Sequence, residues 1–184
     1  MKVLTLLASP RKNGYTSDLL KAYTEGLTAN KSQIDITKKH LEKMTIHACK
    51  GCNACQKNKV NFCVTDDDMI QLYEEIIESD IIVLASPIYF FSVTAQMKSV
   101  LDRLYAILDR VKGKKIVLLT TYGAAKLEDS GVENAVKMIR MTNHIAGTEL
   151  MQEYHVTTGH EEGNTITNQA ALQEVFELGQ SISI

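Results

Sequence analysis

The segment Ser9-Pro-Arg-Lys-Asn-Gly14-Tyr-Thr-Ser17 concentrates groups that bind anions. It follows an apolar run typical of a buried strand, residues 1–8, and leads directly into an amphipathic helical pattern. In that position hydroxyl groups, an arginine and the backbone N–H groups of a helix N-terminus converge where the helix dipole is positive. The sequence therefore predicts a phosphate-binding turn between a first strand and a first helix.

Two further segments have the composition of ligand-binding loops. Residues 85–98 read Ala-Ser-Pro-Ile-Tyr-Phe-Phe-Ser-Val-Thr-Ala-Gln-Met-Lys, with a stiffening proline and three consecutive aromatic residues before a helix. Such a loop can border a flat heteroaromatic ring, although aromatic residues at a helix start also serve simply as packing. The segment Thr120-Thr-Tyr-Gly-Ala-Ala125 contains a glycine that lets the backbone approach a ligand or that forms an ordinary turn.

All four cysteines of the chain fall between residues 49 and 63, in the pattern Cys-x2-Cys-x2-Cys-x7-Cys. The first spacings suit thiolate ligation of an iron–sulfur cluster, although ferredoxin motifs have a shorter last spacing followed by proline, where this chain has Val64. Zinc also accepts four thiolates, but its usual sites pair two Cys-x2-Cys units across a longer gap. Disulfides are disfavoured in a reducing cytosol. The pattern alone leaves a cluster, zinc and free or redox-active thiols open.

The elements that must position these residues follow from the hydrophobic pattern. Short β-branched runs alternate with longer helical periods, which is typical of a parallel sheet covered by helices on both faces. We expect strands at residues 2–8, 33–37, 81–85, 115–121 and 150–157, and helices at residues 16–29, 67–78, 93–110, 130–145 and 168–182. A phosphate loop after the first of five strands favours an α/β doubly wound three-layer sandwich with the flavodoxin-like order 2-1-3-4-5. The ligand loops would then meet at the carboxyl edge of the sheet.

Length and charge narrow the classes of function. The 184 residues suit a single domain, residues 1–184, with a cysteine-containing insertion at about residues 44–66. A formal net charge of −2 disfavours a nucleic-acid partner, which would need a basic face. No apolar run approaches the length of a membrane span and no signal peptide is recognisable, so we expect no membrane contact and a cytoplasmic location. Motifs for nucleotide hydrolysis and for a nucleophile elbow are missing.

Other conspicuous residues have structural interpretations. The run Asp66-Asp67-Asp68 suits the positive end of a helix dipole better than a metal site. We expect Met138 and Met141 to pack in the core. The apolar positions of the helix expected at residues 93–110 suit either the core or a partner subunit, and they are Met97, Val100, Leu101, Leu104 and Ile107.

Taken together, the motifs resemble the flavodoxin-like NAD(P)H-dependent FMN reductases. The resemblance covers about the first two-thirds of the chain and rests on Ser9-Pro-Arg-x-x-Gly14-x-Thr16, Ser86-Pro-Ile-Tyr89 and Gln96-Met-Lys-x-x-x-Asp-Arg103. It implies that the FMN phosphate is held by Ser9, Arg11, Gly14, Thr16 and Ser17. It implies that the flavin is bordered by Pro87, Ile88, Tyr89, Phe90, Tyr122 and Gly123. We also count Tyr15 among the cofactor-binding residues, although many relatives carry Asn there.

The same resemblance implies the chemistry. NAD(P)H would deliver hydride to flavin N5 without a catalytic side chain, and the electrons would pass to a quinone, a flavin, a nitro or azo compound, or a protein. The cysteine spacing resembles the iron–sulfur flavoproteins, a branch of this family.

That second resemblance implies one [4Fe–4S] cluster and a ferredoxin-like partner, the ligands being Cys49, Cys52, Cys55 and Cys63. A non-catalytic binding module with zinc in the cysteine loop is a third interpretation. Flavoproteins of this kind are commonly homodimers or homotetramers, and we expect the same here.

Overall fold

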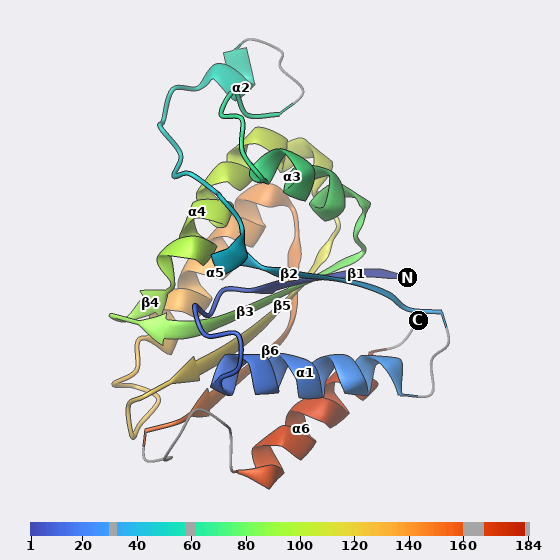
Figure 1. Ribbon diagram of the computed structural model, residues 1–184, viewed down its shortest axis with the longest axis vertical. Helices are drawn as coiled ribbons and strands as arrows, with labels where there is room; N and C mark the ends of the chain where they lie inside the picture. The colour runs from blue at the N-terminus through green and yellow to red at the C-terminus, as the bar shows by residue number, and fades with distance from the viewer. Residues whose placement is uncertain (30–32, 58–61, 160–167, 183–184) are drawn as a thin grey trace.

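The computed structural model describes residues 1–29, 33–57, 62–159 and 168–182. Its parallel sheet consists of β1 (Lys2–Leu7), β2 (Asp35–His40), β3 (Ile81–Tyr89), β5 (Lys115–Tyr122) and β6 (Glu149–Thr157). These strands follow the order β2-β1-β3-β5-β6, and the short β4 (Ser92–Val93) pairs antiparallel with the end of β3 (Figure 1). The five long strands thus have the predicted flavodoxin-like order, and the predicted α/β class is confirmed.

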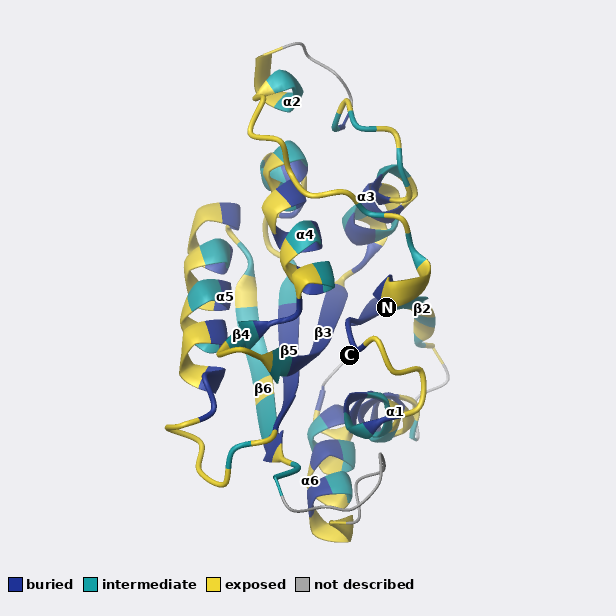
Figure 2. Ribbon diagram, turned by 60° about the vertical axis from the view of Figure 1, so that its left-hand side comes forward, coloured by how far each residue is buried: buried dark blue, intermediate teal, exposed yellow. Residues whose placement is uncertain are grey.

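Helices cover both faces of the sheet (Figures 1 and 2). One face carries α1 (Tyr15–Thr28) and α6 (Gln169–Gln180), and the other carries α3 (Met69–Glu78), α4 (Ala95–Arg103) and α5 (Val132–Ala146). Shorter described elements are η1 (Leu41–Lys43), α2 (Ala54–Lys57) and η2 (Leu104–Arg110). In the described part of the chain, no helix is long and apolar enough to cross a bilayer.

The central strands are apolar on both faces because helices cover both faces. In β3, Ile82 and Leu84 pack with α3, α4 and α5, whereas Val83 and Ala85 pack with α1 and α6. Both clusters are buried, and close packing on the two faces of the sheet holds the strand ends in fixed positions.

The helix predicted over residues 93–110 is interrupted in the structure. α4 ends at Arg103, and η2 follows as a 3-10 segment in which Ile107 has a non-helical φ of −133°. Side chains take two of the carbonyl groups at the break: Tyr73 Oη donates to the carbonyl of Arg103 at 3.0 Å, and Gln56 Nε2 donates to that of Tyr105 at 2.7 Å. These carbonyls would otherwise accept from the next helical turn.

The apolar side of this interrupted helix belongs to the core. The buried members are Met97, Val100, Leu101 and Ile107, and Leu104 packs against them. The core interpretation of these positions is therefore confirmed.

The prediction of a core position is wrong for Met141. Met138 packs against the core, but Met141 is 64% exposed. Met141 lies two residues from the buried Ile139 and Asn143, and residues two apart on an α-helix point about 200° away from each other. The prediction failed because it used the apolar character of Met141 and not its position on the helix.

Close packing of α6 sets the position of α1. A Cβ atom on Gly26 would come closer than 3.0 Å to the carbonyl oxygen of Phe176, and one on Gly179 would do the same at the carbonyl oxygen of Tyr23. Each helix therefore presents a glycine where the backbone of the other approaches.

We expect Gly26→Ala to destabilise the fold by about 1–3 kcal/mol, because the added methyl group overpacks this contact. Helix propensity alone would give the opposite sign, a gain of about 1 kcal/mol. Chemical denaturation measures the difference, and Glu25→Ala on the exposed side of the same helix serves as the control. A stabilised Gly26→Ala protein would contradict the close approach of the two helices.

Candidate cofactor-binding site

A cavity of about 270 Å³ lies where β1, β3 and β5 end. Its lining consists of Ser9, Arg11, Gly14, Tyr15, Thr16, Pro87, Ile88, Tyr89, Thr121, Tyr122, Gly123 and Thr158. Because parallel strands end at one edge of the sheet, loops far apart in the sequence meet there. The structure thus brings together all of the residues predicted to bind the cofactor except Ser17 and Phe90.

Two predicted residues lie elsewhere, and two lining residues were missed. Ser17 lines a neighbouring groove beside β2, and Phe90 is 96% exposed. Thr121 is a strand residue that the sheet register places opposite Pro87. Thr158 follows β6, a strand to which we assigned no ligand loop. Both threonines lie at or just after the end of a predicted strand, and this position could have identified them as residues of the cavity.

The phosphate-binding turn is held from several sides at its start. Ala8 N–H donates to the carbonyl of Ala85 at 2.8 Å, and Thr94 Oγ1 donates to the carbonyl of Ala8 at 3.0 Å. His40 Nε2 lies 2.7 Å from the carbonyl oxygen of Ser9, so this ring nitrogen is the donor. The turn therefore leaves β1 in a direction set by β3, β2 and the start of α4.

The start of α1 forms the end of the cavity that is suited to an anion. Gly14 is the N-cap residue and has no side-chain hydrogen bond to the first turn, so an anion can take the capping role. Ser9 Oγ accepts from the N–H of Arg11 at 3.2 Å, which folds the turn around this end. Thr16 Oγ1 lies 2.7 Å from Thr121 Oγ1 and connects the helix to β5. Hydroxyl groups, a guanidinium and a helix N-terminus therefore face one space.

The opposite wall is formed by the end of β3 and its tight connection to β4. Tyr89 pairs with Ser92, so Phe90 and Phe91 form a two-residue hairpin loop, and their φ angles are 45° and 67°. Positive φ at two adjacent bulky residues is strained, and such strain is concentrated at functional sites. Both rings are exposed, so they do not pack the start of α4.

Neighbouring groups hold this strained loop in place. Gly131 packs so closely that a Cβ atom there would come within 3.0 Å of the Phe91 backbone, and Asn134 Nδ2 donates to the carbonyl of Phe91 at 3.3 Å. Ser86 Oγ accepts from Thr94 N–H at 3.1 Å. The wall beside Tyr89 is therefore preorganised.

The described part of the cysteine insertion, residues 44–57 and 62–66, contains α2, which lies beyond α3 and α4 (Figure 1). All four cysteines are free thiols, and three of the sulfur atoms accept N–H contacts, from Gly51 at 3.5 Å, Gln56 at 3.8 Å and Thr65 at 3.5 Å. Four thiols, three of them with N–H contacts, suit an iron–sulfur cluster in kind. Among the residues that the structure describes, no three Cys, His, Asp or Glu side chains form a group that could hold a metal ion.

The thiol of Cys63 has a distinctive environment. Burial raises the pKa of Cys63, but the N–H of Thr65 and the guanidinium of Arg103 outweigh burial and lower it. Both contacts favour the thiolate form of Cys63, which is the form that ligates metals.

The run Asp66-Asp67-Asp68 does more than start a helix. Asp67 Oδ1 accepts from Met69 N–H at 3.1 Å at the start of α3, as the helix-start interpretation expects. Its other oxygen forms a buried ion pair with Arg103, and both side chains are 1% exposed. Burial alone would raise the pKa of Asp67, but the Arg103 and His47 contacts lower it.

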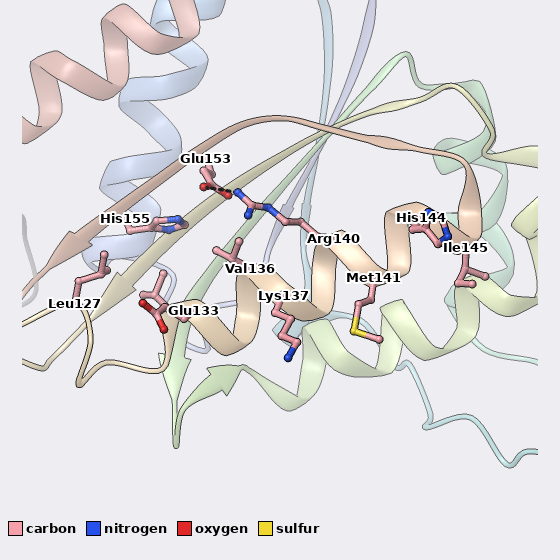
Figure 3. Close-up of a pocket in the computed structure, with 11 residues that line it drawn as sticks. Leu127, Glu133, Val136, Lys137, Arg140, Met141, His144, Ile145, Glu153 and His155 are labelled. Carbon is pink, nitrogen blue, oxygen red and sulfur yellow. Dashed lines mark hydrogen bonds and ion pairs between the residues drawn. The ribbon is translucent and has the colours of Figure 1, made fainter.

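A larger cavity of about 670 Å³ lies between α5 and β6, and it contains none of the predicted site residues (Figure 3). Apolar side chains line much of it, and Arg140 and Glu153 form an ion pair of 3.1 Å at its wall. His155 Nδ1 lies 2.7 Å from Thr120 Oγ1, and burial lowers the pKa of His155. The N-terminal turn of α5 contributes Val132 and Glu133 to this cavity, but the acidic Glu133 disfavours an anion there and no serine or threonine lines the space, so we assign the cofactor site to the smaller cavity.

The sheet order, and the cavity where its strands end, define a flavodoxin-like protein. Residues 1–161 match the family described as NADPH-dependent FMN reductase, and the chain belongs to that family.

Known proteins show how this chain relates to others. An iron–sulfur flavoprotein from Archaeoglobus fulgidus is 38% identical over 140 residues, which are 74% of this chain and 62% of that relative. An iron–sulfur flavoprotein from Methanosarcina thermophila is 29% identical over 151 residues, covering 80% of this chain and 75% of the relative. The chain therefore spans less than two thirds of the Archaeoglobus protein. The structure of an NAD(P)H:quinone oxidoreductase from Methanothermobacter marburgensis is similar with a TM-score of 0.74 at 16% identity, covering 98% of both chains, which confirms the fold.

We expect Arg11→Ala to weaken FMN binding by about 1.5–3 kcal/mol, the usual range for a hydrogen bond to a charged group. Lys12→Ala removes a positive charge from the next, equally exposed residue, which does not line the cavity, and should have a much smaller effect. Titration of the apoprotein with FMN, followed by flavin fluorescence, measures both. Equal losses in the two variants would show that only net charge matters and would remove Arg11 from the site.

Proposed function

We propose that this chain is an FMN-dependent oxidoreductase that accepts hydride from NAD(P)H and passes the electrons to a second acceptor. The observation that carries the proposal is the convergence of the Ser9, Ser86 and Tyr122 loops on one cavity at the carboxyl edge of the sheet. Membership of the NADPH-dependent FMN reductase family supports it. When bound, FMN supplies the redox chemistry, including the conversion between two-electron and one-electron steps.

The residues of the cavity suit FMN in kind. At one end Ser9, Arg11, Thr16 and the N-terminus of α1 offer donors and positive potential for a phosphate. At the other end Pro87, Ile88, Tyr89 and Tyr122 offer flat or apolar surfaces for a ring.

Gly123 leaves space beside this ring-binding wall, because a Cβ atom there would have nothing within 4 Å. Burial and the charge of Glu128 raise the pKa of Tyr122, so its phenol stays protonated and can donate a hydrogen bond. The role of these residues is to bind and orient the cofactor, and no acid–base pair is required of them.

The first test is whether the protein binds FMN and takes up reducing equivalents. Protein purified anaerobically should show a flavin absorption spectrum that bleaches when NADH or NADPH is added, and comparison of the two donors identifies the preferred one. A colourless protein that does not bind added FMN would overturn the proposal.

A second candidate function differs in where the electrons go. The chain would be an iron–sulfur flavoprotein that exchanges electrons with an acidic carrier protein of the ferredoxin type. The cysteine spacing favours it, and both reported relatives have the name iron–sulfur flavoprotein. The ligands would be Cys49, Cys52, Cys55 and Cys63.

Charge around the insertion favours the same kind of partner. Between residues 38 and 66 the chain carries six lysines against the acids Glu42 and Asp66, although the whole chain has a net charge of −2. The lysines are Lys38, Lys39, Lys43, Lys50, Lys57 and Lys59, of which Lys39 is paired with Glu75. Such a local excess of positive charge steers an acidic protein toward the cysteines.

We expect Cys52→Ser to lose bound iron and to retain FMN, because the insertion and the flavin cavity use different residues. Iron and flavin are measured per chain after reconstitution with Fe²⁺ and sulfide under anaerobic conditions. Asn53→Ser changes the adjacent, equally exposed residue to the same side chain and should leave iron unchanged. Equal iron content in Cys52→Ser and the unmodified protein would exclude Cys52 as a ligand.

A further inference from the structure

We propose that Arg103 is the positioning residue of the cysteine insertion: its guanidinium closes the base of the insertion against α4 and thereby fixes where the thiols lie. The inference rests on the proposed iron–sulfur function of these cysteines, and it adds a residue that none of the cysteine spacings indicates.

One guanidinium joins the two chain segments that enter and leave the insertion. Arg103 Nη1 contacts the carboxylate of Asp67 and donates to the carbonyl of His47 at 3.3 Å. Its Nη2 donates to the carbonyl of Thr65 at 3.3 Å. His47 lies just before Cys49 and Thr65 lies just after Cys63, so both ends of the cysteine loop are tied to the same side chain.

The aspartate run completes this closure. Asp67 Oδ2 accepts from His47 N–H at 2.9 Å, and Asp68 Oδ2 accepts from Thr45 N–H at 2.6 Å. Asp68 N–H also donates to the carbonyl of Thr45 at 3.1 Å. The entering segment, residues 45–47, and the leaving segment, residues 65–68, are therefore held together without a β ladder.

The environment of Arg103 indicates a role beyond packing. Arg103 is 2% exposed, and its side chain and that of its partner Asp67 are each only 1% exposed. Its Nε–H is also buried and has no hydrogen-bond partner in the described part of the chain. Burying a cation with an unsatisfied donor is costly, so an apolar residue of similar volume would serve stability at least as well. The guanidinium also acts on the thiol of Cys63 through hydrogen bonding and charge.

α4 connects this closure to the flavin cavity. The helix begins at Thr94, whose N–H donates to Ser86 Oγ at 3.1 Å and whose Oγ1 donates to the carbonyl of Ala8 at 3.0 Å. It ends at Arg103, about 14 Å away along a helix of nine residues at 1.5 Å per residue. The same rigid element therefore sets the position of the cavity wall and of the insertion.

Two variants test the role of Arg103. Arg103→Met combined with Asp67→Asn removes both buried charges, so neither is left unpaired, and it removes the bridge to His47 and Thr65. Arg103→Lys keeps the charge but loses the planar fork that reaches both carbonyl groups. Arg140→Met combined with Glu153→Gln is the matched control, because it removes an arginine–carboxylate pair that is exposed and lies on α5 and β6.

The measurements are iron and FMN per chain after anaerobic reconstitution with Fe²⁺ and sulfide, and hydrogen exchange of the backbone N–H groups of residues 45–47. In the double variant at Arg103 we expect iron affinity to fall by about 10-fold or more, as for other residues that orient metal ligands. We expect FMN content to stay at the unmodified level and exchange at residues 45–47 to rise by about 10-fold or more. Arg103→Lys should restore only part of the exchange protection and of the iron, and the control pair should match the unmodified protein.

The possible outcomes separate this inference from the proposed function. Parallel loss of iron and FMN in the double variant would show a general structural role and overturn the inference. Full rescue by lysine would overturn it as well, because charge alone would then suffice. If the unmodified protein takes up no iron, the iron–sulfur function fails, and with it the positioning of cluster ligands; the exchange at residues 45–47 then still decides whether Arg103 closes the insertion.

Discussion

The sheet edge that carries the proposed cofactor site depends on the parallel pairing of β1 with β3. The hydrogen bond from Ala8 to Ala85, one step beyond the pairing of Leu7 with Ala85, carries the pairing into the loop that turns toward α1. Thr94 then binds the carbonyl of Ala8, so the wall after β3 and the phosphate-binding turn share one set of hydrogen bonds. A ligand that spans both loops meets a surface already in place, which reduces the entropy lost on binding.

The buried pair of Arg103 and Asp67 performs a different task. Among the described residues of the insertion only Phe62 is buried in the core, and charge pairing at the base of the insertion adds order that apolar packing does not supply there. Such a pair contributes little net stability compared with apolar packing, but it selects one arrangement over others. The pair thereby joins the insertion to α4, the helix that begins beside the proposed flavin site. One helix therefore connects the two proposed redox sites.

Much of this architecture was predictable, for identifiable reasons. The runs at residues 81–85 and 115–121 are apolar on both faces, which only a sheet covered on both sides requires. The turn from Ser9 to Ser17 carried its own signal because its chemistry is local. Failures came where a contact from elsewhere in the chain decided the outcome. Tyr73 and Gln56 take carbonyl groups that would have continued the helix beyond Arg103, and neither lies near that helix in the sequence.

The sequence by itself determined the alternation of strands and helices, the polar turn after the first strand and the presence of a cysteine insertion, because each depends on residues within one short segment or on their periodic spacing. Only the tertiary structure decided which residues with hydroxyl groups line the cavity, as Thr121 and Thr158 show. It also decided that the side chain of Arg103 is buried. These outcomes depend on register and on packing between segments that are distant in the chain, for which no local pattern exists.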